Sequence, residues 1–187
     1  MERLLENISS KVPLSKDLEE TIIAKFKLEE FPKNQLLLKE QQYCRRLYFL
    51  EEGTVRTFYY EKEKDISSWF YNEGHFFASW YSFYSQQPSF EYIESLEESK
   101  IYSIDYFEYQ KLLETIPAFE RFGRLLAEEQ TAFIDLYSKC YMFLSAKERY
   151  NLLLHNFPDI ELRVKLGYIA SFLGISQETL SRIRSRK

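Results

Sequence analysis

The last 25 residues, from Arg163 to Lys187, have the apolar spacing of two short helices that cross at a steep angle. Ala170 is small where the helices would approach most closely. Gly174 falls just past the first helix, where a left-handed backbone suits a residue without Cβ, and Ser176 can cap the second helix. The pattern predicts a helix-turn-helix, with an ordinary helical hairpin as the alternative. The residues predicted to fill the angle are Ile169, Leu173, Ile175, Leu180 and Ile183.

The second predicted helix has a polar face that suits contact with DNA. Arg182 can donate two hydrogen bonds to guanine, and Glu178 can accept one from the amino group of cytosine. Such side chains reach base edges when a recognition helix lies in the major groove. The residues expected on this face are Gln177, Glu178, Ser181, Arg182 and Ser185.

Charge is distributed unevenly along the chain. The whole chain has a formal net charge of −4, which alone argues against binding to nucleic acid. Residues 1–161 carry 19 basic and 28 acidic residues, whereas residues 162–187 carry six basic and one acidic. A basic module on an acidic body is typical of a regulator that holds DNA at one end only; a solvated basic tail is the alternative.

The composition argues against membrane, secreted and metal-binding classes. No apolar run approaches the roughly 20 residues that cross a bilayer, and the segment from Met1 to Glu6 lacks the core of a signal peptide. Cys44 and Cys140 lie far apart, without CxxC or Cys/His spacing. We therefore expect a cytoplasmic protein with no metal site and no cofactor, in which both cysteines are packing residues.

Short apolar or alternating runs separated by turn signals occupy residues 27–105, after a helix predicted for residues 14–27 with Ser15 as its cap. They predict an antiparallel barrel of about eight strands, and a short helix is expected at 76–85. The predicted strands are 35–39, 46–51, 54–60, 66–71, 90–96 and 100–104.

Helical patterns return after the barrel. Pro117 is suited to the first turn of a long helix that reaches about Leu144. Ser145 and Glu148 form a capping-box pattern for a further helix to about Phe157. The long helix could pair with a second subunit on one side, or it could be a single-sided core helix. Its apolar stripe is Phe122, Leu126, Phe133, Tyr137, Cys140, Tyr141 and Leu144.

The order of barrel, long helix and helix-turn-helix resembles the Crp/Fnr family of bacterial transcription regulators, especially the short regulators of Bacteroidetes. The resemblance rests on residues 47–56 for a barrel hairpin, on Gly74 at the start of the ligand cassette, and on residues 176–182 for the recognition helix. It implies an α+β fold: an antiparallel jelly-roll barrel of the cyclic-nucleotide-binding type at 1–116, a connecting and dimerisation helix at 117–144, and a helix-turn-helix DNA-binding domain at 145–187.

The same resemblance implies a homodimer that binds an inverted repeat in double-stranded DNA near promoters, with RNA polymerase as a further partner. Gln177, Glu178 and Arg182 match the positions that touch bases. Hydroxyls would contact phosphates, and basic residues near the end of the chain would add salt-sensitive affinity. The hydroxyl-bearing residues are Ser171, Ser176, Thr179 and Ser181, and the basic ones are Arg184, Arg186 and Lys187.

Two departures from the family pattern change what we expect. The chain stops at Lys187, so a truncated or absent wing is expected. In members that bind cyclic AMP, a Gly-Glu-Leu turn and an arginine hold the ribose and phosphate, whereas here the turn is Ala78-Ser79-Trp80 and the arginine position falls at Ser89. An unpaired phosphate near Glu91 and Glu94 would be costly to bury. We therefore predict that cyclic AMP does not bind in the usual mode.

Eleven of the 24 residues from Trp69 to Tyr92 are aromatic. One interpretation is an apolar pocket for a small flat effector; the other is that the rings fill the pocket and no effector binds. Haem ligation by His75 is a further, weaker alternative. The predicted pocket residues are Trp69, Phe77, Ser79, Trp80, Ser89 and Tyr92.

No nucleophile–base order, Gly-rich phosphate loop or HExxH motif points to an enzyme. The remaining alternative to a DNA-binding regulator is a ligand-binding barrel whose terminal helices contact other proteins.

Overall fold

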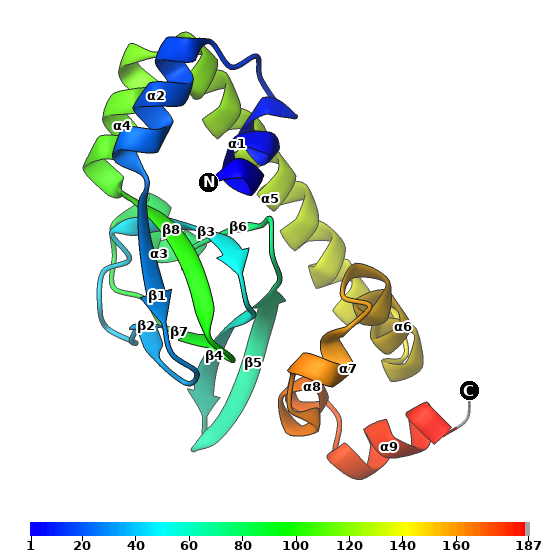
Figure 1. Cartoon of the computed structure of the whole chain (residues 1–187). Coiled ribbons are helices and arrows are strands. Elements are labelled where there is room, and N and C mark those ends of the chain that lie inside the picture. Colours follow the sequence, from blue (N-terminus) through cyan, green and yellow to red (C-terminus); the bar gives the residue numbers. More distant parts are fainter. Residues whose placement is uncertain (186–187) are drawn as a thin grey trace.

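The structure is a computed structural model that describes residues 1–185. It is an α+β architecture in which two antiparallel sheets precede a long helix and a group of short C-terminal helices (Figure 1). The strands are β1 (Lys27–Phe31), β2 (Leu36–Leu38), β3 (Arg46–Glu52), β4 (Val55–Glu61), β5 (Lys64–Tyr71), β6 (Phe76–Phe77), β7 (Tyr92–Ser95) and β8 (Ser99–Asp105). The helices are α1 (Glu2–Ser9), α2 (Lys16–Lys25), α3 (Trp80–Ser85), α4 (Tyr106–Thr115), α5 (Pro117–Phe143), α6 (Ala146–Asn156), α7 (Ile160–Arg163), α8 (Leu166–Phe172) and α9 (Gln177–Ser185).

The strands form two four-stranded sheets, in the orders β1-β8-β3-β6 and β2-β7-β4-β5. This confirms the predicted antiparallel barrel of about eight strands. Two of its strands were not predicted, because β1 is largely polar and β6 has only two residues. The helix expected at 76–85 was wrong in its first turn: Phe76 and Phe77 pair with Phe49 and Tyr48 of β3, and the helix begins only at Trp80.

Side-chain caps mark where several helices begin. The Ser15 hydroxyl accepts from the Leu18 N–H at 3.2 Å, as predicted for α2. Ser145 and Glu148 form both bonds of the predicted capping box of α6. Helices α1, α4 and α7 were not predicted, although α4 has its own cap in Asp105.

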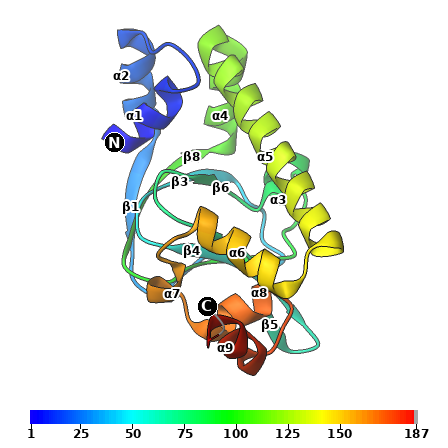
Figure 2. The same ribbon diagram turned by 90° about the vertical axis from the view of Figure 1, so that its right-hand side faces the viewer.

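The long helix α5 runs from the N-terminal helices to α6 (Figures 1 and 2). Its first half is part of the barrel core, where Phe119, Phe122 and Leu126 are buried. Gly123 allows α4 to come close, since a Cβ there would lie 2.4 Å from a methyl carbon of Leu113. Much of the predicted apolar stripe therefore packs within the chain, which leaves other residues to form the exposed side of α5.

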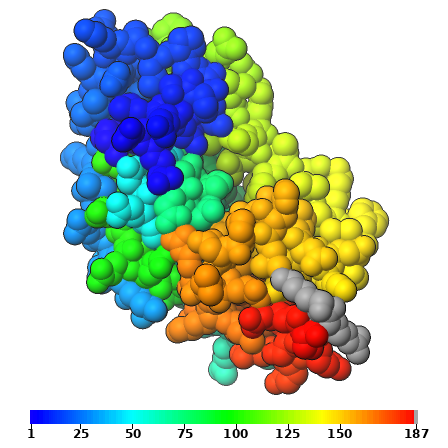
Figure 3. Space-filling view, turned by 45° about the vertical axis from the view of Figure 1, so that its right-hand side comes forward, coloured from blue at the N-terminus to red at the C-terminus, as the bar shows by residue number. Residues whose placement is uncertain are grey.

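The C-terminal helices pack directly on the barrel, as the space-filling view shows (Figure 3). Helix α8 lies against β5. The ring of Phe172 contacts those of Trp69 and Phe70, with centroids 5.2 and 5.5 Å away. The Ser171 hydroxyl accepts from the Ser67 N–H at 3.1 Å. Ser171, expected at a DNA phosphate, therefore lies in the contact between α8 and the barrel.

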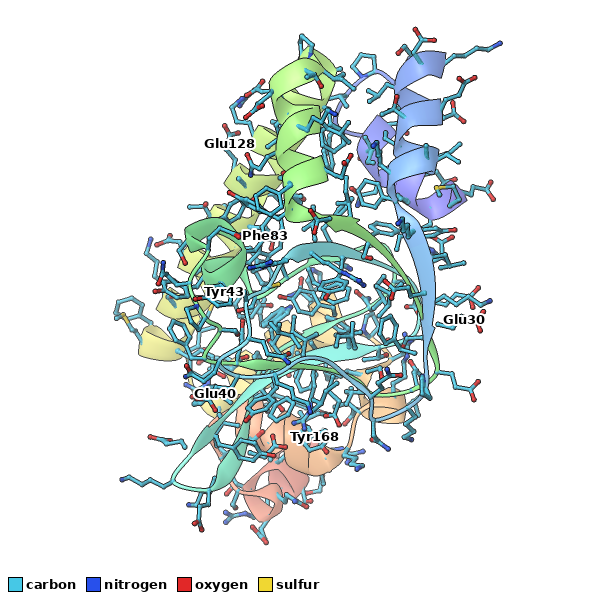
Figure 4. The ribbon with its side chains drawn as sticks, turned by 90° about the vertical axis from the view of Figure 1, so that its left-hand side faces the viewer. Glu30, Glu40, Tyr43, Phe83, Glu128 and Tyr168 are labelled. Carbon is cyan, nitrogen blue, oxygen red and sulfur yellow. The ribbon has the colours of Figure 1, made fainter. Side chains whose placement is uncertain are left out.

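A buried arginine forms the polar centre of this contact. Arg56 of β4 is 2% exposed and donates to both carboxylate oxygens of Asp65, at 2.6 and 2.7 Å, and to Glu94 at 2.8 Å. The guanidinium lies between two rings, 4.0 Å from the centroid of Phe58 and 3.5 Å from that of Tyr168 in α8. Figure 4 shows Tyr168 where α8 meets the sheet. An aromatic side chain of the C-terminal helices thus completes the burial of a barrel cation.

A second arginine also links the C-terminal helices to the barrel. Arg163 of α7 donates to Glu73 at 2.9 Å, to Glu97 at 2.6 Å and to Asp159 at 3.2 Å. Glu73 follows β5 and also accepts from the Gly53 N–H at 3.0 Å. We call these four charged residues the Arg163 network. Because two of its carboxylates belong to the barrel, the network fixes α7 to the sheets.

Gly53 should tolerate substitution less well than Gly174. Its φ is +107°, and a Cβ there would lie 2.9 Å from the Cα of Ser99. Gly174 has φ +67° and open space around it. We expect Gly53→Ala to lower the free energy of unfolding by roughly 3 kcal/mol or more, since it combines strain with a clash. Gly174→Ala should cost about 1 kcal/mol. Urea unfolding measures both, and equal losses would contradict the assignment.

The Arg163 network should make stability depend on pH through Glu73. Burial by itself raises the pKa of Glu73, but the hydrogen bonds from Arg163 and from backbone N–H groups outweigh it and hold the pKa below its usual value of 4.5. A lowered pKa stabilises the fold above about pH 4.5 and loses this effect as the pH falls through the folded-state pKa. Glu73→Gln should therefore be less stable than the wild type near neutrality, by a margin that shrinks in acid. The exposed Glu61→Gln is the control, and a margin independent of pH would argue against the network.

Candidate DNA interface and ligand cavity

The C-terminal segment forms two helices, α8 and α9, joined by a turn. Gly174 has the left-handed backbone expected from the sequence, with φ +67°. The Ser176 hydroxyl accepts from the Thr179 N–H at 3.2 Å and so caps α9, as predicted. Ile169, Leu173 and Leu180 are buried between the helices, and Ile175 and Ile183 pack against them.

Helix α9 lies at an end of the molecule, with one side free (Figure 2). Its predicted base-contacting residues Gln177, Glu178 and Arg182 are exposed, as is Ser181. Thr179 is half-buried and accepts from Arg182 at 3.1 Å. The pKa of Glu178 lies below its usual value, chiefly because the Ser176 hydroxyl is hydrogen-bonded to it. Near neutral pH this face therefore presents an amide, a carboxylate and a guanidinium.

Part of the positive charge of the segment is paired within the chain. Arg184 forms an ion pair with Glu161 of α7, with Nε 2.6 Å from Oε1, and Arg163 belongs to the Arg163 network. Arg186 and Lys187, which were also predicted to bind DNA, lie outside the described residues. A free positive charge on α9 itself is provided by Arg182, whose partner is the Thr179 hydroxyl.

The second half of α5 has an apolar side that contacts solvent. Ile134 is 51% exposed, and Met142 and Phe143 at the end of the helix are 76% and 79% exposed. We call the exposed seam formed by Thr131, Ile134, Ser138 and Tyr141 the α5 ridge. These residues are spaced by three, four and three, and Ile134 and Tyr141 are its large apolar members. Such spacing places side chains along one seam of a helix, where a second helix can pack.

A cavity of about 290 Å³ lies between the barrel and the second half of α5. Trp69 and Trp80, both predicted as pocket residues, line it. The barrel side supplies Thr57, Ser68, Trp69, Tyr71, Trp80 and Glu91, and α5 supplies Gln130, Phe133, Ile134, Tyr137, Ser138 and Tyr141. Ligand pockets usually occupy about 300–1,000 Å³, so this cavity suits a small molecule.

Glu91 is the charged residue of this lining. Its Oε2 accepts from the Ser68 hydroxyl at 3.1 Å, and Ser79 also hydrogen-bonds to it. Burial raises the pKa of Glu91 against the opposing effect of these two hydroxyls. Among residues 1–185, no lysine or arginine lines the cavity or forms an ion pair with Glu91.

Four predicted pocket residues do not line the cavity. Phe77 is buried in β6 and stacks on Tyr48. Ser79 and Ser89 are buried behind Glu91 and bond to each other at 2.9 Å. Tyr92 stacks on Phe58 and bonds to Glu40 instead. Glu94, expected to repel a bound phosphate, is paired with Arg56. The wall from α5 was not predicted because it depends on where a distant helix packs.

A second cavity of about 280 Å³ lies nearby, between α1, the β5–β6 turn, α5 and α6. His75 lines it, and its Nδ1 lies 3.2 Å from the carbonyl oxygen of Asn72. Residues 1–185 contain no group of three or more His, Cys, Asp or Glu side chains placed to bind a metal ion. Within the same residues, no helix combines the length and apolar character needed to cross a bilayer.

Sequence comparison identifies the barrel. Residues 28–116 match the family model of the cyclic nucleotide-binding domain. No curated protein matches the chain significantly.

Solved structures with the same fold include several bacterial regulators. The c-di-GMP-responsive global regulator CLP of Xanthomonas campestris is 16% identical, with a TM-score of 0.70 over 92% of this chain and 91% of that one. A regulator assigned to the Crp/Fnr family from Eubacterium rectale is 16% identical, with a TM-score of 0.70 over 92% and 83%. FixK2 from Bradyrhizobium japonicum is 17% identical, with a TM-score of 0.68 over 86% and 83%. Residues 28–116 are therefore similar to a cyclic nucleotide-binding domain, and the fold of the chain is similar to that of these regulators.

Proposed function

We propose that this protein is a sequence-specific DNA-binding transcription regulator of the Crp/Fnr type, similar to the short regulators of Bacteroidetes. The observation that carries the proposal is the exposed polar face of α9, on a helix pair that packs against a cyclic nucleotide-binding domain. Gln177, Glu178 and Arg182 would read bases, and Ser176, Thr179 and Ser181 would contact phosphates. Arg186 and Lys187, with Arg184 once it leaves Glu161, would add non-specific affinity.

We further propose three functional parts: a sensor at 1–116, a connecting helix at 117–144 and a DNA-binding domain at 145–187. The regulator would act in the cytoplasm as a homodimer on an inverted repeat, next to RNA polymerase. Two copies would pair along the α5 ridge, because Ile134 and Tyr141 are exposed, apolar and seven residues apart, and would gain from burial against a second copy.

Cyclic AMP should not bind in the usual mode. The cavity holds Glu91 where an anionic ligand would need a cation, and Arg56 already pairs with Asp65 and Glu94 outside the cavity lining. An unpaired phosphate beside a carboxylate is unfavourable in a partly buried site.

A second candidate function is a ligand-binding barrel whose C-terminal helices contact a protein. The pairing of Arg184 with Glu161 favours it, since that pair reduces the positive charge that α9 offers to DNA. Salt-dependent binding to duplex DNA separates the two candidates, because only the regulator would release counterions from phosphates.

Removing the guanidinium of Arg182 should weaken binding to the operator. We expect Arg182→Ala to cost roughly 1–3 kcal/mol and to relax base preference at one position in each half-site, because a bidentate contact to guanine would be lost. Gln177→Ala should likewise weaken binding. Electrophoretic mobility shift with a genomically footprinted site measures both. Arg121→Ala removes an exposed arginine of α5 as the control. If both variants bind like the wild type while the control is also neutral, the regulator proposal fails as stated.

A charge on the α5 ridge should break the proposed dimer. We expect Ile134→Lys to raise the dimer dissociation constant tenfold or more, since burial of an isoleucine is worth roughly 1.5–3 kcal/mol and occurs twice in a symmetric interface. Sedimentation velocity measures the change. Leu162→Lys is the matched control, because Leu162 is an exposed apolar residue outside α5. A dimer that survives Ile134→Lys unchanged would show that the ridge is not the interface.

A further inference from the structure

The cavity beside α5 has the side chains of a cation site rather than of an anion site. Six of its lining residues are aromatic: Trp69, Tyr71, Trp80, Phe133, Tyr137 and Tyr141. The faces of such rings are negative and attract organic cations within about 6 Å of a ring centroid. Trp80 comes from the barrel side and Tyr141 from α5, so aromatic residues line both sides of the cavity. Arg149 lies 5.0 Å from the centroid of the Tyr141 ring, and Trp80 stacks on Tyr84.

Glu91 supplies a carboxylate without a protein cation to balance it. The two hydroxyls bonded to it are neutral. Arg56 of the barrel is paired with Asp65 and Glu94, and Arg163 of α7 belongs to the Arg163 network. Partial burial of a carboxylate costs free energy, because hydration is lost, unless a cation or several hydrogen-bond donors compensate. Asp65, Glu94 and Glu73 are partly buried carboxylates that an arginine balances, whereas Glu91 has no such partner, and a bound cation would supply one.

We propose that this cavity binds a small organic cation of the alkylammonium type, with Glu91 as its counter-ion and the surrounding rings as its cage. The hydroxyls of Thr57 and Ser68 and the amide of Gln130 also line the cavity, where they can hydrogen-bond to one polar group of the same ligand. This ligand class differs from the anionic nucleotides that the matched domain is named for. The cavity volume of about 290 Å³ limits the guest to a small molecule.

A ligand in this cavity would contact residues of the proposed dimer interface. Ile134, Ser138 and Tyr141 line the cavity and also belong to the α5 ridge. A guest that moved them would change the surface offered to a second copy. This consequence rests on the proposed dimer, whereas the binding site itself does not.

Intrinsic fluorescence can report on binding directly, because the two tryptophans of the chain, Trp69 and Trp80, both line the cavity. The probe is choline, titrated into the full-length protein at constant ionic strength. The matched control is its neutral isostere, in which carbon replaces nitrogen. We expect choline to change the tryptophan spectrum saturably and to bind about tenfold or more tightly than the isostere, since shape is equal and only charge differs.

Glu91→Gln removes the charge while keeping the shape of the side chain. We expect it to weaken choline binding by about tenfold or more and to leave the isostere unaffected. Glu98→Gln, at an exposed carboxylate, should change neither. Circular dichroism shows whether each variant is folded, and the comparison of choline with its isostere on the wild type decides the question even where Glu91→Gln does not fold.

Several results would overturn the proposal: no saturable response to choline, equal binding of choline and its isostere, or Glu91→Gln binding choline like the wild type. Saturable binding of cyclic AMP that Glu91→Gln strengthens would also overturn it, in favour of an anion site. Each of these results leaves DNA binding untouched. The failure of the ligand assignment is therefore distinguishable from failure of the proposed regulator function, which depends on Arg182.

Discussion

The closure of Tyr168 over the buried Arg56 is the contact on which the arrangement of this chain depends. A guanidinium that is 2% exposed has given up its hydration, and Asp65 and Glu94 restore its charge balance within the barrel. One face of the ion is nevertheless covered by a ring from α8. Lifting α8 away would expose that face, so the barrel is complete only with the C-terminal helices in place. The position of α9 is set by this requirement, because α9 follows α8 through a single short turn.

The Arg163 network works in the reverse sense, since its cation comes from the C-terminal helices and two of its carboxylates come from the barrel. Glu73 lies at the end of β5, and Glu97 lies in the turn between β7 and β8. Reorienting α8 and α9 would have to separate both the Arg56–Tyr168 contact and the Arg163 network. The same motion would also separate the Phe172 ring from Trp69 and Phe70. Polar and apolar contacts therefore together hold the C-terminal helices on the barrel.

The sequence predicted correctly the features that depend only on neighbouring residues. Caps at Ser15, Ser145 and Ser176 and the left-handed Gly174 need only neighbouring residues, and all four are present. Elements whose existence depends on a partner were missed: β1 has a polar sequence and is a strand because β8 pairs with it. The same limit applies to the cavity. Trp69 and Trp80, predicted from aromatic density, line the cavity, whereas Tyr92 does not, because density does not reveal which side of a strand faces inward.

Net charge by segment overstates the free positive charge of the C-terminal helices, for a reason that bears on both proposed sites. Residues 162–187 carry an excess of five positive charges, yet Arg163 and Arg184 are each paired with carboxylates from outside α9. Such ion pairs make the free charge of a segment smaller than its formal charge. The residues that point to a ligand are then the charged residues that have no ion-pair partner within the described chain. Within the described residues, Arg182 is such a cation on α9, and Glu91 is such an anion in the cavity. Each faces the place where a ligand of opposite charge would have to lie.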